Sequence, residues 1–326
     1  MKKITRRSFL AVCGTVAAAA ALTACGGSAS SASTTASSVA SAASSTAAKA
    51  AGTLSGHVVT GGSTSMKNVF AALTEGFAEV EPGVTVSYDP TGSGAGITGA
   101  TDKTLDIGLS SRALKDDEKN DVDGTTVALD GIAIIVNKDS KVADLTVEQL
   151  KKMFTGEITT WNDEAIASQN EGVELPDTPI TVVHRSDDSG TTENFTAYLT
   201  EAAGDAWSYD EVETWPADIT AESAQGTTGV VGLVSSNEGA ITYADASAVD
   251  GLGTVDVKVG EEYVAYSAEA AAATVEKSEA NEDGSIELDR ATTEAGVYPV
   301  VLVSYHIYCN QYKDQETVDQ VKAFAW

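Results

Sequence analysis

The sequence predicts an α/β fold of two lobes, each a mainly parallel sheet flanked by helices, with a ligand in the cleft between the lobes. From residue 55 onward, segments with strand-like alternation are followed by segments with the 3.6-residue period of a helix. Several of these strands end in glycine- and hydroxyl-rich loops, and such loops lie at the ligand-binding carboxyl edge of α/β sheets. About 270 residues follow the N-terminal segments, enough for two lobes.

The first two strand-like runs are each followed by a glycine- and hydroxyl-rich loop. The strand-like run at 57–60 leads into Gly-Gly-Ser-Thr-Ser at 61–65, and the apolar residues from Met66 to Phe77 then keep a helical period. The alternating run at 84–88 leads into Thr-Gly-Ser-Gly-Ala-Gly-Ile at 91–97. The glycines in both loops let the backbone approach a ligand closely.

The middle of the chain supplies two more strands and a capped helix. A short strand at 105–109 ends in Ser-Ser-Arg at 110–112, and a longer apolar strand at 127–136 is interrupted by Asp-Gly at 130–131. Thr146, with Gln149 three residues later, is a capping box that opens a helix.

The later elements continue the alternation of strands and helices. A strand at 180–183 delivers Arg185, residues 268–277 form a helix, 278–290 form a solvated acidic loop, and an apolar strand returns at 300–308.

The segment 184–195 is the most informative part of the chain. It places Arg185 four residues ahead of Ser189, Gly190 and Thr191, directly before helix-compatible sequence. A guanidinium, small hydroxyls and backbone N–H groups at a helix start form a receptor for an oxyanion. The alternative is an ordinary helix cap, but the two similar loops upstream favour the anion site. Because those loops precede the strand at 127–136 and Arg185 follows it, the ligand is expected to bridge the lobes.

The N-terminus predicts export and a lipid anchor. Residues 1–24 form a basic and then apolar signal peptide with a twin-arginine-like string, and Leu-Thr-Ala-Cys at 22–25 resembles a lipobox that is acylated on Cys25. Residues 25–54 are rich in Ser, Ala and Thr and predict a disordered tether. The protein is therefore expected on the outer face of a bacterial cytoplasmic membrane.

The charge and the cysteines narrow the functional classes. The chain has 20 Lys plus Arg against 48 Asp plus Glu, and removal of the signal takes the formal charge from -28 to -32, which excludes nucleic acid as a partner. After the tether the remaining cysteine is Cys309, which is expected to be a buried, inert thiol, so a disulfide scaffold is excluded.

At its loops the chain resembles the phosphate-binding proteins of bacterial phosphate ABC importers, which are type II periplasmic-binding proteins. The resemblance covers essentially the whole chain after the tether. It rests on the segments 62–65 (Gly-Ser-Thr-Ser), 92–94 (Gly-Ser-Gly), 106–112 (Asp-Ile-Gly-Leu-Ser-Ser-Arg), 185–191 (Arg-Ser-Asp-Asp-Ser-Gly-Thr), 154–163 and 239–243. It implies the two-lobed type II fold, with lobe 1 at 55–130 plus 296–326 and lobe 2 at 131–295.

The resemblance also implies a ligand, partners and site residues. The ligand is inorganic phosphate, delivered by a monomer to a membrane permease, with no cofactor and no metal. The implied phosphate-binding residues are Thr64, Ser65 through its N–H, Ser93, Arg185, Ser189, Gly190 and Thr191, with Asp187 orienting Arg185.

Two positions depart from the family pattern. Well-known members have an aspartate that accepts the proton of hydrogen phosphate where this chain has Ser111, which we keep in the predicted site. Asp130 is the candidate for the missing acceptor, and its alternative is a strand-end turn residue. Arg112 is either a second cation or a solvated surface arginine. The chain also stops at residues 324–326 where the family usually continues, so it is either incomplete or closed differently.

Three other functions remain open. A binding protein for sulfate, molybdate or tungstate would share the architecture. A phosphatase-like enzyme would use Ser93 or Ser189 as a nucleophile, but the three histidines lack metal-ligand spacing and no Gly-x-Ser-x-Gly segment occurs. An adhesive surface lipoprotein would leave the arginine and hydroxyl loops without a role.

Overall fold

A computed structural model describes residues 52–203, 207–281 and 283–325. The expected signal at 1–24, the lipidation site at Cys25 and the tether as far as residue 51 lie outside these residues. Within the described residues, every helix is too short or too polar to cross a membrane.

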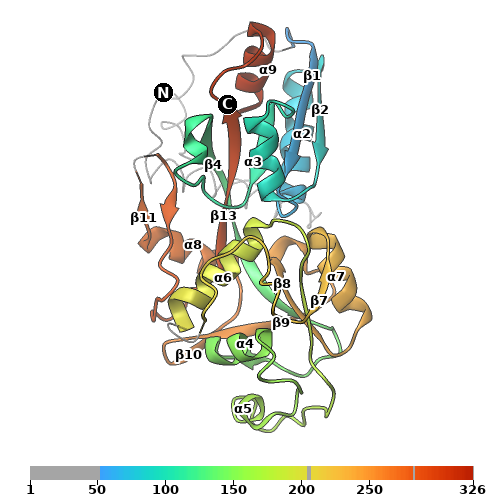
Figure 1. The fold of residues 1–326 in the computed structure, drawn as a ribbon, viewed down its shortest axis with the longest axis vertical. Helices are drawn as coiled ribbons and strands as arrows, with labels where there is room; N and C mark the ends of the chain where they lie inside the picture. The colour runs from blue at the N-terminus through green and yellow to red at the C-terminus, as the bar shows by residue number, and fades with distance from the viewer. Residues whose placement is uncertain (1–51, 204–206, 282, 326) are drawn as a thin grey trace, which may run out of the picture.

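Two lobes lie one above the other, and two long strands run between them (Figure 1). These strands, β4 (Val122–Val136) and β13 (Val301–Cys309), pair antiparallel as far as Gly131 of β4. Beyond Gly131, β4 pairs instead with β8 (Ala240–Asp245). The two-lobed α/β fold predicted from the sequence is confirmed, and its two sheets are continuous through β4.

The interruption predicted within the long strand is wrong, because β4 passes through Asp130 and Gly131 without a break. Glycine is required at 131 because the ring of Tyr266 packs on the strand there. A Cβ atom at Gly131 would lie 2.0 Å from Cε2 of Tyr266. The glycine makes room for an aromatic ring instead of ending the strand.

In the part of the chain that the structure describes, lobe 1 holds the N-terminal strands and three α-helices. Its elements besides the two long strands are β1 (Gly56–Gly62), α2 (Lys67–Val80), β2 (Val84–Asp89), α3 (Ser93–Thr101), β3 (Ile107–Ser110) and α9 (Gln315–Ala325). β1 pairs in parallel with β2 and β3. Phe324 of α9 packs on Phe70 and Phe77 of α2, with ring centroids 5.4 and 5.1 Å apart. Helix α9 therefore covers apolar side chains of this lobe.

Lobe 2 holds most of the remaining strands and five α-helices of the described residues. These are β5 (Asp144–Leu145), α4 (Val147–Phe154), α5 (Glu164–Ala167), β6 (Thr181–Arg185), α6 (Gly190–Ala203), β7 (Glu222–Ala224), α7 (Gly226–Ser236), β8, β9 (Gly253–Val259), β10 (Glu262–Val264) and α8 (Ala268–Lys277). Two short strands, β11 (Glu279–Ala280) and β12 (Ile286–Glu287), pair with each other in a separate sheet, and Ile286 packs on the core cluster of lobe 1. β6 pairs in parallel with β7 and β8. The predicted capping box of Thr146 and Gln149 is present at α4.

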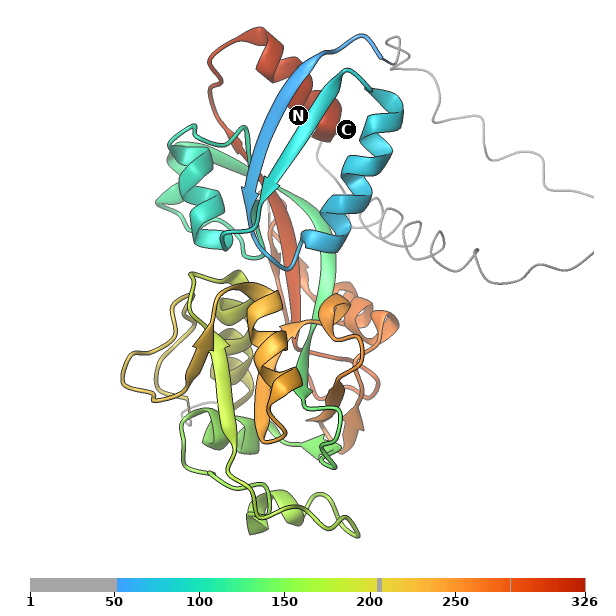
Figure 2. The same ribbon diagram turned by 90° about the vertical axis from the view of Figure 1, so that its right-hand side faces the viewer.

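Loops of the two lobes meet where the strands end and the helices begin (Figure 2). In lobe 1, β1 leads into α2 and β2 into α3; in lobe 2, β6 leads into α6 and β7 into α7. Helix N-termini carry free N–H groups and partial positive charge. The fold thus brings several such ends to the boundary between the lobes.

Candidate functional site

The first loop is fixed by a glycine that no other residue can replace. Gly62 has φ 128° at the end of β1, and a Cβ atom there would lie 2.1 Å from the carbonyl oxygen of Leu109. The N–H of Ser63 donates to this same oxygen at 2.7 Å, and the Tyr88 hydroxyl donates to the Ser63 carbonyl at 2.6 Å. Thr64 and Ser65 follow in the turn that leads into α2 and are largely buried.

The second and third loops are joined through Ser93 and Ser111. Ser93 is the first residue of α3, and its Oγ accepts a hydrogen bond from the N–H of Ser111 at 3.0 Å. The Ser111 hydroxyl itself is fully buried and contacts the hydroxyls of Ser63 and Ser65 at 2.5 and 2.6 Å. A fourth hydroxyl, that of Ser304, lies 3.2 Å from it. Ser111 therefore belongs to a cluster of serine hydroxyls inside lobe 1.

Arg185 ends β6 and is held by Asp187, as the resemblance implied. Nε of Arg185 donates to Oδ1 of Asp187 at 2.8 Å, and Nη2 donates to Oδ2. Asp187 Oδ1 also accepts the N–H of Gly226 at 2.8 Å. Burial alone would raise the pKa of Asp187, but the Arg185 hydrogen bond and charge outweigh it and hold the pKa below its ordinary value. The pair fixes the guanidinium plane.

The start of α6 lies directly on the loops of lobe 1. Ser189 Oγ accepts from the N–H of Thr192 at 3.3 Å, so the cap predicted as an alternative is present. Gly190 has no room for a side chain, since a Cβ atom would lie 2.7 Å from Ser93 Oγ and 2.7 Å from the carbonyl carbon of Ser111. Thr191 is buried beside it. The cap leaves the other N–H groups of this helix start at the lobe boundary.

A fifth glycine- and hydroxyl-rich loop, between β7 and α7, was not predicted from the sequence. β7 is followed by Gly226, with φ 68°, and Thr227, which open α7. The Thr227 hydroxyl lies 3.1 Å from the Thr64 hydroxyl, and the Thr227 N–H donates to Thr64 Oγ1 at 3.2 Å. The signal was present as Gly-Thr-Thr-Gly at 226–229, but the strand before it is only three residues long.

A buried carboxyl group, that of Asp245, and a half-buried one, that of Asp130, lie near the junction of β4 and β8. Asp130 accepts from the N–H of Gly131 at 2.8 Å and from the Tyr266 hydroxyl at 3.1 Å, and burial, with the charge of Asp245, raises its pKa to about 6. Asp245 ends β8 and accepts from the Thr227 hydroxyl at 2.9 Å. Asp245, which the sequence reasoning missed, is thus the carboxylate that is bonded to the loops, while Asp130 bonds to Tyr266.

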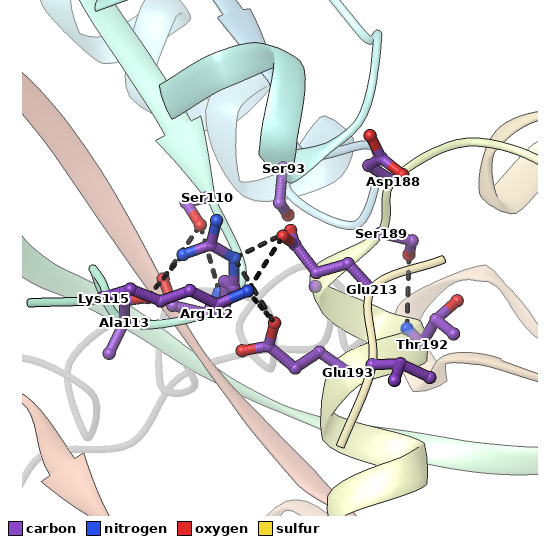
Figure 3. Close-up of polar contacts among 12 residues, drawn as sticks. Ser93, Ser110, Arg112, Ala113, Lys115, Asp188, Ser189, Thr192, Glu193 and Glu213 are labelled. Atoms are coloured by element: carbon purple, nitrogen blue, oxygen red, sulfur yellow. Dashed lines mark hydrogen bonds and ion pairs between the residues drawn. The ribbon is translucent and has the colours of Figure 1, made fainter. Parts of the chain in front are cut away.

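Arg112 is part of an ionic cluster between the lobes (Figure 3). Its Nη1 and Nη2 each donate to Glu118 at 2.7 Å, and its Nε lies 2.7 Å from Glu213 and 3.4 Å from Glu193. Lys115 lies 3.5 Å from both of the latter carboxylates. The reading of Arg112 as a solvated surface arginine is wrong, because four acidic and basic neighbours surround it and only 4% of it is exposed.

Comparison with known proteins decides the family. A family model described as a PBP superfamily domain matches residues 29–326. The chain belongs to the PBP superfamily. The phosphate-binding protein PstS2 of Mycobacterium bovis is 32% identical over 98% of this chain and 89% of that protein. The phosphate-binding protein PstS 3 of Mycobacterium leprae is 32% identical over 81% of this chain and 76% of that protein.

A solved structure shares the fold of this PBP superfamily chain. It is described as a putative phosphate ABC transporter substrate-binding protein with bound phosphate from Clostridium perfringens. Its TM-score is 0.61 at 27% identity, covering 83% of this chain and 93% of that one. The family resemblance drawn from the loops is confirmed.

The histidines of this PBP superfamily member have structural contacts. His184 stacks on Trp215 with ring centroids 5.2 Å apart, and its Nδ1 is hydrogen bonded to the Arg185 carbonyl. His306 lies among Phe70, Tyr308 and Phe324. Among the described residues, no group of three or more His, Cys, Asp or Glu side chains is arranged to hold a metal ion. Cys309 is a buried free thiol, as predicted.

Proposed function

We propose that this protein is an exported, lipid-anchored receptor that binds inorganic phosphate between its lobes and delivers it to the permease of an ABC importer. One observation carries the proposal. Arg185, oriented by Asp187, and the starts of helices α2, α3, α6 and α7 come together at the lobe boundary. The relatives named as phosphate-binding proteins match along nearly the whole chain, which supports the same ligand here.

The residues proposed to bind phosphate are Thr64, Ser65, Ser93, Arg185, Ser189, Gly190 and Thr191. They supply one cation, hydroxyl groups and backbone N–H groups, and in a site closed to water such hydrogen bonds are strong. The site needs no excess of basic residues, which agrees with a chain whose formal charge is -28. Binding of one dianion by groups from both lobes would favour the closed arrangement.

Calorimetric titration of the full chain with phosphate, sulfate and molybdate tests this function. We expect tight phosphate binding in the unmodified protein and its loss in Arg185→Ala, with the melting temperature of the unliganded variant checked for folding. Arg185→Lys keeps the charge but not the two-pronged pairing with Asp187, so its affinity is expected to be intermediate. Unchanged phosphate affinity in Arg185→Ala would sink the proposal.

The second candidate is a receptor for another tetrahedral oxyanion, favoured by Ser111 at the position of the family aspartate. Competition distinguishes the two: if sulfate displaced phosphate at equal concentration, the phosphate assignment would fall. We further propose that the protein is not an enzyme, because Ser93 and Ser189 bond to backbone N–H groups and not to a histidine. Release of phosphate from a phosphate ester by the purified protein would contradict this.

The anchor and the export route are tested on whole cells. The lipobox predicts that Cys25 carries the lipid, so Cys25→Ser is expected to move the protein from the membrane fraction into the medium or periplasm. Retention of Cys25→Ser in the membrane fraction would count against the anchor. Replacing both arginines of the twin-arginine-like string by lysine tests that export route.

A further inference from the structure

A chain of hydrogen bonds joins a buried carboxylate in lobe 2 to a hydroxyl in lobe 1. Asp245 is 2% exposed and lies at the carboxyl end of β8. Its Oδ2 accepts from the Ser247 hydroxyl at 2.8 Å, and its Oδ1 accepts from the Thr227 hydroxyl at 2.9 Å. The Thr227 hydroxyl lies 3.1 Å from that of Thr64, which is one of the residues proposed to bind phosphate.

The direction of each bond in this chain follows from counting protons. Burial raises the pKa of Asp245, while the hydroxyls of Ser247 and Thr227 that donate to it oppose that rise and favour the ionised form. An ionised Asp245 only accepts, so the single proton of the Thr227 hydroxyl is used on it. Thr227 Oγ1 can then only accept from Thr64, so the single proton of the Thr64 hydroxyl is used as well. The Thr227 N–H occupies one lone pair of Thr64 Oγ1 at 3.2 Å. One lone pair remains on Thr64 Oγ1, and it can only accept a hydrogen bond.

We propose that Asp245, acting through Thr227, turns the Thr64 hydroxyl into an acceptor that recognises the proton of hydrogen phosphate and rejects unprotonated oxyanions such as sulfate. This inference rests on the proposed function. Hydrogen phosphate donates its P–OH proton to Thr64 Oγ1, whereas sulfate, which has no proton at neutral pH, would place an oxygen lone pair against another lone pair. Asp245 is a positioning residue here, and Thr64 is the group that contacts the ligand.

The arrangement accounts for the serine at the position of the family aspartate. Ser111 is enclosed by the hydroxyls of Ser63, Ser65 and Ser304. The carboxylate that takes the role of the family aspartate lies across the lobe boundary, at the end of β8, and acts on the ligand through the hydroxyls of Thr227 and Thr64. Because Thr227 and Thr64 belong to different lobes, the acceptor is complete only when the lobes are closed.

Thr227→Val tests this relay of hydrogen bonds from Asp245 through Thr227 to Thr64, because valine has the shape of threonine without the hydroxyl. Removal of the Thr227 hydroxyl leaves the proton of the Thr64 hydroxyl free to be donated to the ligand. We expect the ratio of the sulfate Kd to the phosphate Kd to fall about tenfold or more, the effect of one hydrogen bond to a charged group. The titrations are run on the full chain above the second pKa of phosphate. Thr227→Ala, which places no methyl group against Thr64, gives a second reading of the same ratio.

Two controls separate the relay from mere packing. Thr227→Ser keeps the hydroxyl and is expected to keep the ratio. Ser247→Ala removes the other hydroxyl bonded to Asp245 and is also expected to keep it. Arsenate, which carries the same proton as phosphate, is expected to bind the unmodified protein far more tightly than sulfate does.

The outcomes also separate this inference from the proposed function. Tight phosphate binding with an unchanged ratio in Thr227→Val and Thr227→Ala would overturn the relay and leave the phosphate receptor standing. If the ratio of the sulfate Kd to the phosphate Kd fell as far in Thr227→Ser as in Thr227→Val, the relay would be overturned too, because the hydroxyl would then not be the cause. No phosphate binding by the unmodified protein would overturn the proposed function itself.

Discussion

Gly190, the first residue of α6 in lobe 2, lies so close to Ser93, the first residue of α3 in lobe 1, that a Cβ atom on the glycine would be 2.7 Å from the serine Oγ. The backbone of Ser111 is equally close. Glycine at this position is therefore a condition for the lobes to meet.

Gly190→Ala is expected to hold the lobes apart and to weaken phosphate binding about tenfold or more, since each 1.4 kcal/mol lost is a factor of ten. The matched control is Gly232→Ala in α7, where a Cβ atom would meet nothing within 4 Å. Calorimetry gives the affinity, and small-angle scattering with phosphate gives the compactness. An unchanged phosphate affinity in Gly190→Ala would contradict the prediction, because the neighbouring atoms of Ser93 and Ser111 would then have moved to admit the methyl group.

The Arg112 cluster predicts that removing the cation while its acidic partners remain lowers the free energy of unfolding. Arg112→Ala strands Glu118, Glu193 and Glu213 around a buried site, and loss of one partner of a buried ion pair typically costs about 3 kcal/mol or more. Lys138→Ala, which breaks an exposed pair with Asp139, is the control and should cost less than about 1 kcal/mol. Denaturant unfolding of both variants measures the difference. Equal small losses would mean that water reaches the cluster freely.

His306 predicts how stability depends on pH. Burial lowers its pKa in the folded chain from 6.5 to about 4. Between these values the imidazole of His306 is protonated in the unfolded chain and neutral in the folded one. The contribution of His306 to the free energy of unfolding is therefore constant above about pH 6.5 and falls as the pH is lowered, by about 3 kcal/mol in all. His306→Phe should lack this contribution. Urea unfolding across that pH range compares the two proteins, and parallel curves would contradict the assignment.

Gly131 predicts a packing defect in the strand that joins the lobes. Gly131→Ala places a methyl group on the ring of Tyr266 and is expected to lower the free energy of unfolding by about 1–3 kcal/mol. Gly76→Ala in α2 meets nothing within 4 Å and serves as the control, with no loss expected. Unfolding of the two variants in denaturant gives the comparison. A loss confined to the control would contradict the packing role of this glycine.

The sequence predicted those parts of the fold whose signals are local. Helix α8 has the bounds expected from its sequence. The loops at Ser63 and Ser93 were predicted from glycine-rich segments after strand-like runs, and the loop at Ser189 from the Ser-Gly-Thr cluster that follows Arg185. The lobe boundaries at residues 130 and 295, the lipid anchor at Cys25 and the ligand contacts stay predictions.

What the sequence did not predict depends on contacts between distant residues. Thr227 lies 163 residues from Thr64 in the sequence, and Arg112 of lobe 1 pairs with Glu193 and Glu213 of lobe 2. No local pattern encodes such pairs. Gly131 was misread because a glycine beside an aromatic ring and a glycine in a turn look the same in one sequence.

The two long strands that connect the lobes have a mechanical consequence. β4 and β13 are hydrogen bonded to each other, and their register shifts between Ser304 and Tyr305, where a bulge favours bending. A paired ribbon resists sliding and torsion but flexes across its plane. We therefore expect the lobes to rotate about this ribbon, so that Gly190, Arg112 and Thr227 reach their partners together and ligand capture is a single cooperative step.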